Sequence, residues 1–357
     1  MTTMKFLDLD LPEELYDIVA DLVSKLKNRK FEDSISEANA TIELSKRIIL
    51  NCEWKTAEDL MKILKTLGNY FYEVQPSHNV LFNIIRRVLK LIRDEYASHV
   101  MGDHKESEQE SLYRLALSHG PANDYSRFTE SFQMGLLECI DELSSELETS
   151  VGNISQQSLQ HIHNKEYIMT MGRSSLVEAF IKRAAKKRNF TVIVAESAPF
   201  HAGHDLAASL IKDKIKTILI SDSNVFSMMS RVNKVILGTH TVLANGGLKA
   251  LSGSHNMALA AKHFSVPVIV CATILKLSPI FQTLPDQYGF NEFVSPELVL
   301  PFEGELAAVV DVCTPVYDYV PPELVELFIF NIGGNSPSYV YRLLSELYHP
   351  EDYKFGS

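Results

Sequence analysis

Apolar residues recur at helical spacing through the first part of the chain. One stripe consists of Leu15, Ile18, Val19, Leu22, Val23 and Leu26. Its members lie at i, i+3, i+4, i+7, i+8 and i+11, which is one face of an amphipathic helix. Asp33 is placed to cap a second helix, and Gly68 to end a third that begins near Ala57. A fourth stripe starts at Val80, so the pattern predicts a helical N-terminal domain over residues 1–128.

The pattern changes to short apolar runs from about residue 166 onward. Five runs rich in β-branched residues begin at Tyr167, Thr191, Lys216, Lys234 and Pro267. Each is nearly continuous in apolar residues, which is typical of strands that helices cover on both faces. Helical segments are expected between the runs and near residues 322–330 and 337–347. We therefore expect an α/β fold in which residues 166–357 form a Rossmann-like, doubly wound parallel sheet.

Acidic residues concentrate between these two patterns. Residues 101–150 contain eleven Asp or Glu against three Lys or Arg, and so carry most of the net charge of −11. The first part of this stretch has no sustained periodicity and predicts a polar acidic loop near residues 98–128. An apolar stripe restarts at Phe132, so a connecting helix is expected over residues 129–165.

The composition favours a folded protein that does not bind nucleic acid directly. Of the 357 residues, 46% are hydrophobic and 22% charged, close to the average for folded proteins and far from a disordered chain. The negative net charge opposes binding to a phosphate backbone. No apolar run reaches the roughly 18 residues that cross a bilayer, and the four widely spaced cysteines fit a reducing compartment. We expect a cytoplasmic, cytosolic protein with no membrane segment.

Polar residues follow several of the predicted strands, where open parallel sheets bind their ligands. The candidates for a strand-end pocket are Gly172, Arg173, Ser174, Glu196, His240 and Asn245. The first three begin a predicted helix, whose N–H groups and dipole favour an anion, although helix capping explains the same residues. Glu196 could work with His201 or His240 as an acid–base pair, and a structural role is the competing interpretation.

The remaining motifs predict no cofactor, and one basic run has two possible interpretations. Neither the dinucleotide pattern G-x-G-x-x-G nor the P-loop pattern G-x-x-x-x-G-K-[ST] occurs. His201 and His204 have H-x-x-H spacing, but neither a Cys nor a carboxylate lies beside them at a recognised metal-ligand interval, so no metal is predicted. The run from Lys182 to Arg188 holds five basic residues, which suits a solvated helix end or a docking patch for an acidic or phosphorylated partner.

Longer motifs around the predicted strands resemble a known family. Residues 243–263 (LANGGLKALSGSHNMALAAKH) and 267–272 (PVIVCA) resemble the family that unites methylthioribose-1-phosphate and ribose-1,5-bisphosphate isomerases with the alpha, beta and delta subunits of eukaryotic translation initiation factor 2B. Residues 168–172, 192–200 and 317–350 resemble its beta branch in particular. The helical N-terminal part fits the same family in order and length, so the chain is identified as a member over its whole length.

The resemblance places the chain outside the catalytic branch of that family. In the isomerases, a Cys and an Asp at strand ends move a proton between neighbouring carbons. Gly172 stands at the Cys position and His240 at the Asp position, while Ala198 replaces an expected arginine. Asn245 and its turn are kept. The strand-end pocket is therefore expected to be vestigial, and sugar-phosphate isomerase activity is the alternative.

The resemblance implies instead a non-catalytic regulatory subunit of the guanine-nucleotide exchange factor for initiation factor 2. In that complex the epsilon subunit carries GDP-for-GTP exchange, while alpha, beta and delta sense phosphorylation of the alpha subunit of initiation factor 2. The implied partners are the alpha, gamma, delta and epsilon subunits, with delta the closest, and initiation factor 2 itself. The helical domain is expected to face the alpha subunit of initiation factor 2.

The C-terminal segment holds the candidate subunit interface. Its residues are Asn331, Gly333, Gly334, Tyr339, Tyr341 and Arg342. Tyrosine and arginine are frequent interface anchors, and paired glycines allow close approach of a second backbone. Tyrosines packed inside a core are the competing interpretation.

Overall fold

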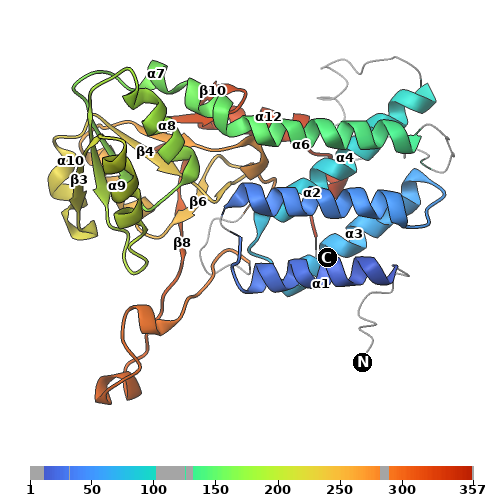
Figure 1. Cartoon of the computed structure of the whole chain (residues 1–357), viewed down its shortest axis with the longest axis horizontal. Coiled ribbons are helices and arrows are strands. Elements are labelled where there is room, and N and C mark those ends of the chain that lie inside the picture. Colours follow the sequence, from blue (N-terminus) through green and yellow to red (C-terminus); the bar gives the residue numbers. More distant parts are fainter. Residues whose placement is uncertain (1–11, 32, 102–124, 126–131, 282–288, 356–357) are drawn as a thin grey trace. The chain divides into compact units, whose positions relative to one another are not determined.

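The chain, which Figure 1 colours by residue number, divides into two compact units. The computed structural model describes residues 12–31, 33–101, 125, 132–281 and 289–355. Unit 1 comprises Met1–Glu148, Ser278–Ile280 and Arg342–Ser357. Unit 2 comprises Thr149–Leu277 and Phe281–Tyr341.

These units differ from the expected domains at the C-terminal end of the chain. We expected residues 166–357 to form one domain, but the residues from Arg342 onward belong to unit 1. The reason is that this tail bonds to helical residues of unit 1, as described below for Asp352. Most of the acidic loop expected near residues 98–128 lies outside the described residues.

Unit 1 is built from amphipathic helices. They are α1 (Glu13–Lys27), α2 (Ser34–Asn51), α3 (Ala57–Val74), α4 (Asn79–Met101) and the first part of α6 (Phe132–Gln156). The predicted cap of the second helix is confirmed, because the Asp33 carboxylate accepts a hydrogen bond from the Ser36 N–H at 2.8 Å. The first stripe is also confirmed as a buried face. Its most buried members, at most 4% exposed, are Leu15, Val19, Leu22 and Leu26.

The third helix does not end at Gly68, as the sequence predicted, but continues to Val74. Glycine at this position has a packing role instead. A Cβ atom built on Gly68 would lie 2.5 Å from Cε1 of the Phe355 ring, well inside van der Waals contact. The missing side chain therefore makes room for an aromatic ring from the C-terminal tail.

A seven-stranded sheet forms the centre of unit 2. Its strands are β1 (Tyr167–Met171), β2 (Thr191–Ala195), β3 (Lys216–Ile220), β4 (Lys234–Gly238), β7 (Val268–Cys271), β9 (Leu327–Phe330) and β10 (Gly333–Asn335). The strand order is β10-β9-β7-β4-β1-β2-β3, and every neighbouring pair is parallel except β10 with β9. The five predicted strands are confirmed, and an antiparallel strand closes one edge.

Helices cover both faces of this sheet. They are α8 (Ser175–Ala185), α9 (Ala202–Lys212), α10 (Val225–Met229) and α11 (Ser254–His263). Phe180 of α8 and Leu206 of α9 share a buried cluster with Ile168 of β1. Met171 lies an odd number of residues further along β1 and so faces the other side, where its sulfur is 3.5 Å from the Ser254 hydroxyl at the start of α11. The doubly wound arrangement is confirmed.

The stretch of residues 322–330, where we expected a helix, ends in the strand β9. Only a single 3-10 turn, Pro322–Leu324, precedes β9. Leu327 pairs with Ile269 of β7, and the rings of Phe328 and Phe330 stack at 5.4 Å on one side of β9. A short apolar run has no helical or strand periodicity of its own, so the neighbouring strand decided its conformation.

Several short elements complete the fold. A small antiparallel sheet of order β5-β6-β8 contains β5 (Thr241–Val242), β6 (Leu248–Leu251) and β8 (Tyr317–Val320). The remaining α-helices are α7 (Ser158–His161) and α12 (Val340–Leu347). The further 3-10 turns are Asp222–Asn224, Ile274–Lys276, Pro296–Leu298, Glu305–Ala308, Pro337–Tyr339 and Pro350–Asp352. Within the described ranges, the helices are all too short or too polar to cross a lipid bilayer.

Candidate functional site

The strand order reverses between β1 and β4, and this switch point is where an open parallel sheet usually binds a ligand. Glycines at this point permit very close packing. A Cβ atom on Gly172, whose φ is +59°, would lie 2.6 Å from the Leu251 side chain. One on Gly238, the last residue of β4, would lie 2.6 Å from the Ser174 hydroxyl. The chain is therefore packed against itself at the two strand ends that flank the switch point.

Arg173, just before the helix that follows β1, pairs with a carboxylate of that same helix. The exposed Arg173 places Nε 3.3 Å from a carboxylate oxygen of Glu178 in α8. Burial opposes ionisation of Glu178, but hydrogen bonds from Lys182 and Ser209 and the charge of Lys182 lower its pKa overall. Ser174 stands at the N-cap without a side-chain cap bond. The cationic group expected to favour an anion is thus paired with a carboxylate.

The basic run from Lys182 to Arg188, at the C-terminal end of α8, contains both paired and exposed side chains. Lys182 lies 2.8 Å from Glu178 and 2.9 Å from Asp213. Arg183, Lys186 and Lys187 are exposed. The run therefore keeps three solvated cations at the end of the helix.

Glu196 directly follows β2 and lies beside two imidazoles from the start of α9. Its Oε2 is 3.8 Å from His201 Nδ1 and 3.7 Å from His204 Nε2. In the sequence, His204 stands out only through its H-x-x-H spacing from His201, and nothing in that spacing indicates that Glu196 is its neighbour. The fold therefore assembles a three-residue group that the sequence suggested only in parts.

His240 and Asn245 are held by local contacts. His240 Nδ1 is 2.9 Å from the Thr241 hydroxyl, and its ring lies 4.8 Å from the ring of Tyr317. The Asn245 amide donates to the Tyr319 hydroxyl at 2.8 Å, and its oxygen accepts from the Gly247 N–H at 2.9 Å. Both side chains therefore stabilise the small sheet and its turn.

Cys271 is the cysteine that ends a strand of the large sheet, and it is fully buried. Burial raises the pKa of its thiol to about 12. A thiol in this environment stays protonated at neutral pH, so it is a poor nucleophile. Cys271 therefore does not substitute for the isomerase cysteine, whose position in this chain is occupied by Gly172.

The candidate interface residues are in part structural and in part exposed. The Asn331 side chain accepts a hydrogen bond from the Ile274 N–H at 3.0 Å, and Gly333 and Gly334 pair with β9 at the sheet edge. Tyr339 and Tyr341 are 37% and 59% exposed, which does not fit tyrosines packed in a core. Arg342, in unit 1, forms an exposed ion pair with Glu346 at 3.1 Å.

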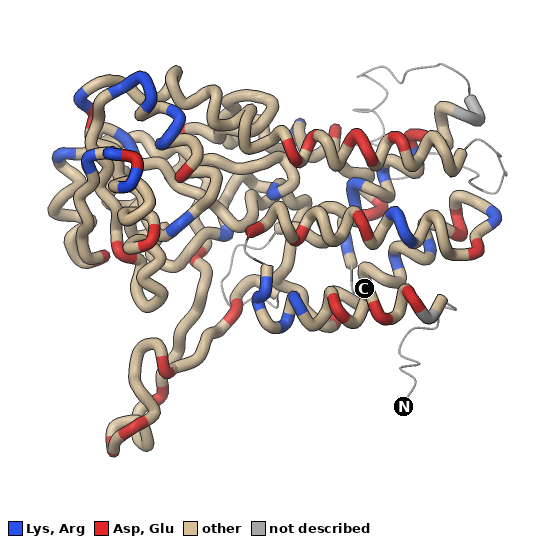
Figure 2. Tube along the Cα trace, viewed as in Figure 1, with Lys and Arg blue, Asp and Glu red and all other residues tan. Residues whose placement is uncertain are grey.

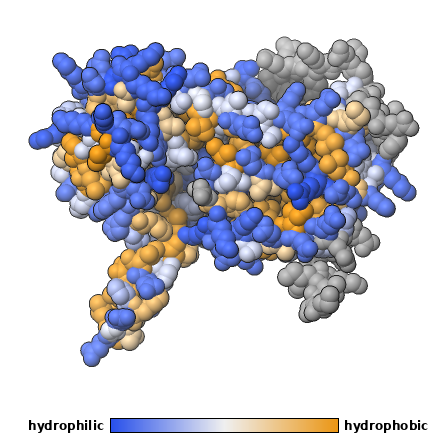
Figure 3. Space-filling view, viewed as in Figure 1, coloured by the Kyte–Doolittle hydropathy of each residue, from blue (hydrophilic) through white to orange (hydrophobic). Residues whose placement is uncertain are grey.

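A larger apolar surface, which the sequence pattern did not predict, lies on an extension of unit 2. We call residues 293–313 the arm; Figure 3 shows it as a largely apolar projection. Its base is closed by a bridge between Phe293 and Pro315 and by a hydrogen bond from the Val294 N–H to the Thr314 carbonyl at 3.1 Å. Between 44% and 79% of each of seven apolar residues is exposed. They are Phe293, Leu298, Val299, Phe302, Leu306, Val309 and Val310.

The charged residues of the arm are all acidic. Figure 2 shows Asp and Glu along it and neither Lys nor Arg. The acidic residues are Glu297, Glu303, Glu305 and Asp311. The signal was present in the sequence, where apolar residues alternate with Pro and Glu in no regular period, but the pattern alone does not distinguish an exposed arm from a buried loop.

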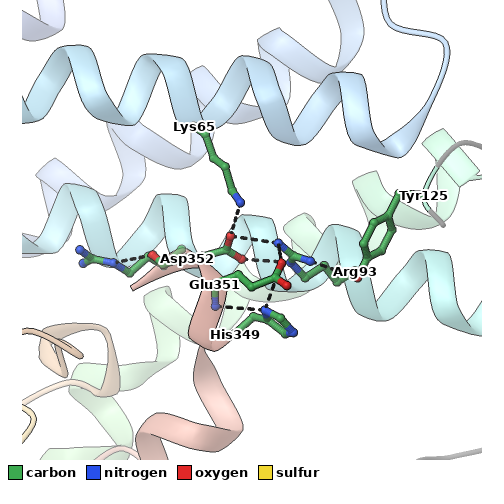
Figure 4. Close-up of polar contacts among 7 residues, drawn as sticks. Lys65, Arg93, Tyr125, His349, Glu351 and Asp352 are labelled. Atoms are coloured by element: carbon green, nitrogen blue, oxygen red, sulfur yellow. Dashed lines mark hydrogen bonds and ion pairs between the residues drawn. The ribbon is translucent and has the colours of Figure 1, made fainter. Parts of the chain in front are cut away.

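Unit 1 contains a buried ionic group that fixes the C-terminal tail, which Figure 4 shows in detail. The carboxylate of Asp352 is fully buried and accepts hydrogen bonds from Nε and Nη2 of Arg93, both at 3.1 Å. Lys65 lies 2.8 Å from the same carboxylate, and Glu351 lies 3.0 Å from Arg93. Arg93 also donates to the Tyr125 hydroxyl at 3.1 Å. We call these five residues the tail cluster.

A second arginine holds the backbone of the tail. Arg86, 1% exposed, donates to the carbonyl oxygens of Asp352 at 3.2 Å and Tyr353 at 3.0 Å, and its guanidinium lies 4.8 Å from the centre of the Phe355 ring. Burial lowers the pKa of Arg86 to about 10, although the neighbouring Tyr348 and Asp352 oppose that shift. The guanidinium therefore remains charged at neutral pH while it is buried.

A helical unit and a unit centred on a mostly parallel sheet, with a close-packed switch point and an apolar arm, define an α/β protein. The chain belongs to the initiation factor 2 subunit family, whose model matches residues 31–337. It is 40% identical to translation initiation factor eIF2B subunit beta of Dictyostelium discoideum, over 92% of this chain and 94% of that protein.

Solved structures agree with this family. The crystal structure of eIF2B beta from Chaetomium thermophilum matches with a TM-score of 0.70 and 26% identity, over 96% of this chain and 93% of that one. A chain of the tetrameric eIF2B-beta2-delta2 complex from C. thermophilum has the same fold, with a TM-score of 0.70 at 24% identity over 94% of this chain and 95% of that one.

Proposed function

We propose that this chain is a non-catalytic beta-type subunit of the guanine-nucleotide exchange factor for initiation factor 2, acting in the cytosol during translation initiation. In this role it supports exchange of GDP for GTP by another subunit and helps to sense phosphorylation of the alpha subunit of initiation factor 2. The family and the likeness to eIF2B beta proteins support the general role. The arm is the structural observation that carries it.

The arm supports assembly because its apolar side chains lack a core of their own. Seven of them are about half exposed or more on one extension, whereas scattered single apolar residues are the usual state of a surface. Burying one large side chain contributes about 2 kcal/mol. A subunit that covers the arm would therefore gain substantial binding free energy.

The charges of the arm restrict the partner surface. Acidic side chains accompany the apolar ones and basic side chains do not, so a complementary surface is an apolar groove rimmed by Lys or Arg. We assign this groove to a delta-type subunit, because a beta–delta complex exists for similar proteins from C. thermophilum. The alpha, gamma and epsilon subunits complete the proposed assembly, and the exposed Tyr339 and Tyr341 extend the proposed interface.

The strand-end residues support a non-catalytic role. The positions that would hold the acid and the nucleophile carry His240, in contact with Thr241 and Tyr317, and Gly172, which has no side chain. Cys271 is buried with a pKa of about 12. An isomerase would need a thiolate and a carboxylate facing a substrate. We therefore propose that this pocket is vestigial.

Co-expression with the four other subunits of the same organism tests the proposal. The tagged chain should recover all four partners, and the eluate should accelerate GDP release from initiation factor 2. Phe302→Ser in the arm should weaken the delta contact by about 2 kcal/mol, roughly thirtyfold in affinity. Leu50→Ser, which changes an apolar residue that is 57% exposed on α2, is the matched control and should assemble normally.

One result would contradict the proposed role as a whole, and another would contradict only the assignment of the arm. A chain that purifies alone and does not affect GDP release is not such a subunit, and an isomerase assay with methylthioribose-1-phosphate and ribose-1,5-bisphosphate would follow. Normal assembly of the Phe302→Ser variant would remove the arm from the interface while leaving the general role in place.

A further inference from the structure

Glu196, His201 and His204 bring three metal-ligating atoms together on one side of unit 2. The carboxylate oxygen Oε2 lies 3.8 Å from His201 Nδ1 and 3.7 Å from His204 Nε2, and the three ligand atoms are all within 4.8 Å of one another. Among the residues that the structure describes, no other three His, Cys, Asp or Glu residues meet in this way. Both imidazoles are about half exposed, so an ion can reach them from solvent.

The backbone that carries these ligands is held independently of any ion. The carboxylate of Asp222 accepts hydrogen bonds from the N–H groups of Ser197 at 2.9 Å and Ala198 at 2.7 Å. The His201 N–H donates to the Ser197 carbonyl at 2.9 Å, and the Gly203 N–H donates to the Glu196 carbonyl at 3.1 Å. These bonds fix the segment between the carboxylate and the first imidazole, which lowers the entropy cost of organising a site.

Two non-glycine residues in this segment adopt a left-handed backbone. Ser197 has φ of +62° and His201 has φ of +53°. A left-handed backbone costs free energy for any residue that has a Cβ atom. Residues in this conformation are found most often at functional sites, where the surrounding structure holds a side chain in a set direction. Gly203 makes the same turn possible, because a Cβ atom there would lie 2.1 Å from the Ala195 carbonyl oxygen. The segment is therefore shaped so that His201 and His204 both approach Glu196.

We propose that Glu196, His201 and His204 form a binding site for a divalent transition metal, with zinc the best match. Two imidazoles and one carboxylate are a ligand set that zinc uses with a further position left for water or a small ligand. Zinc–nitrogen and zinc–oxygen bonds of about 2.0–2.2 Å place ligand atoms of a tetrahedral site roughly 3.3 Å apart. The two distances from Glu196 to the imidazoles, 3.8 and 3.7 Å, are close to that value, and all three ligand atoms lie within 4.8 Å of one another, so rotation of exposed side chains brings them onto one ion.

This site could not be read from the spacing of the ligands. H-x-x-H is common on helices, and the carboxylate precedes the first histidine by five residues, on the far side of a turn. Only the path of the chain from the end of β2 into α9 brings the three together. The site is independent of the proposed arm interface, so either can fail while the other stands.

Zinc binding to the full chain, purified with any subunits that it retains, tests the proposal. Accessible thiols are alkylated first, since Cys313 is exposed and would compete for the ion. Zn²⁺ affinity is then measured by competition with a chromophoric chelator. We expect one bound equivalent per chain, weakened by more than about tenfold in His204→Ala and in Glu196→Gln, since even outer-shell partners of a metal contribute that much. His163→Ala removes an exposed imidazole outside the site and should leave the affinity unchanged.

Two further measurements distinguish a metal-binding site from a simple ion pair between Glu196 and the two histidines. Zn²⁺ should raise the melting temperature of the wild type but not that of His204→Ala, because only a ligand that binds the folded state stabilises it. Co²⁺ should give visible d–d bands without thiolate charge-transfer bands, as expected for nitrogen and oxygen ligands. Wild-type affinity equal to that of a His201→Ala/His204→Ala double variant would show that the three residues form only an ion pair, and would overturn the proposal.

Discussion

The carboxylate of Asp352 and the guanidinium of Arg93 form a two-point ion pair inside unit 1, with both hydrogen bonds at 3.1 Å. The two residues are separated by 259 positions in the chain. Asp352 is 1% exposed and Arg93 6% exposed, so neither charge can be solvated by water if its partner is removed. This pair, together with Lys65, fastens the end of the chain to the helices of unit 1.

Removing the charge of Asp352 should therefore loosen the tail. Asp352→Asn leaves Arg93 and Lys65 with a neutral partner in a buried place, and we expect the free energy of unfolding of unit 1 to fall by about 3 kcal/mol. Urea denaturation of the full chain, followed by a fluorescent label in unit 1, measures this loss. Glu346→Gln breaks the exposed pair with Arg342 and is the control, with an expected loss of no more than about 0.5 kcal/mol. An equal loss of unfolding free energy in the two variants would show that the buried pair stabilises unit 1 no more than the exposed pair does.

Gly68 and Phe355 should be coupled in stability. Gly68→Ala places a Cβ atom 2.5 Å from the Phe355 ring, and we expect it to destabilise the wild type by about 1–3 kcal/mol. In a Phe355→Ala background the obstacle is gone, and the same change should stabilise the chain by up to about 1 kcal/mol, since alanine favours a helix over glycine. A double-mutant cycle on the unfolding free energies checks this change of sign. Additive effects would mean that the ring does not pack against Gly68.

The cysteines should differ sharply in reactivity towards iodoacetamide. Cys313 is the last residue of the arm, beside its base, and is exposed, whereas Cys271 is buried and its thiol has a pKa of about 12. In the folded chain we expect label on Cys313 and essentially none on Cys271 until denaturant is added, as read by peptide mass spectrometry. When the proposed partner subunits are present, the label on Cys313 should decrease as well. Unchanged labelling of Cys313 in a purified complex would argue that the arm stays free.

Glu178 should contribute a pH-dependent part of the stability. Its hydrogen bonds from Lys182 and Ser209 lower its pKa below the ordinary value of about 4.3, against the opposing effect of burial. A carboxylate with a lowered pKa stabilises the fold fully above the unfolded pKa, and this stabilisation is lost as pH falls through the folded pKa. Glu178→Gln should therefore be less stable than the wild type at pH 7 and lose less stability on acidification to pH 3. Parallel stability curves between pH 7 and pH 3 would count against this role.

Local sequence patterns predicted the structure correctly where residues close together in the chain determine it. The stripe from Leu15 to Leu26 predicted a helix because one apolar face at a period of 3.6 residues can be buried only by a helix. The run at Thr191 predicted a strand covered on both faces, and the structure forms β2 there, which pairs with β1 and β3. Asp33 predicted its cap because its carboxylate can reach the N–H of Ser36, three residues on.

Local patterns predicted the structure wrongly or only in part where contacts between residues far apart in the chain determine it. Gly68 predicted a helix end, but the helix continues to Val74, and the Phe355 ring fills the space of the missing side chain. The stretch before Phe330 predicted a helix, but pairing with β7 made it a strand. The sequence suggested Glu196 as part of an acid–base pair with His201 or His240. In the structure, its carboxylate lies beside His201 and His204.

The amino-acid sequence by itself therefore determined the class of the fold, the order of its two main parts and the family to which the chain belongs, since each rests on periodicity or on contiguous motifs. Only the tertiary structure decided where the tail from Arg342 onward is bound, which apolar residues stand exposed on the arm, and which polar side chains meet at Glu196 and at Asp352. The physical reason is that burial and ionic contacts depend on distances through space, and the chain folds residues such as Arg93 and Asp352 together from far apart.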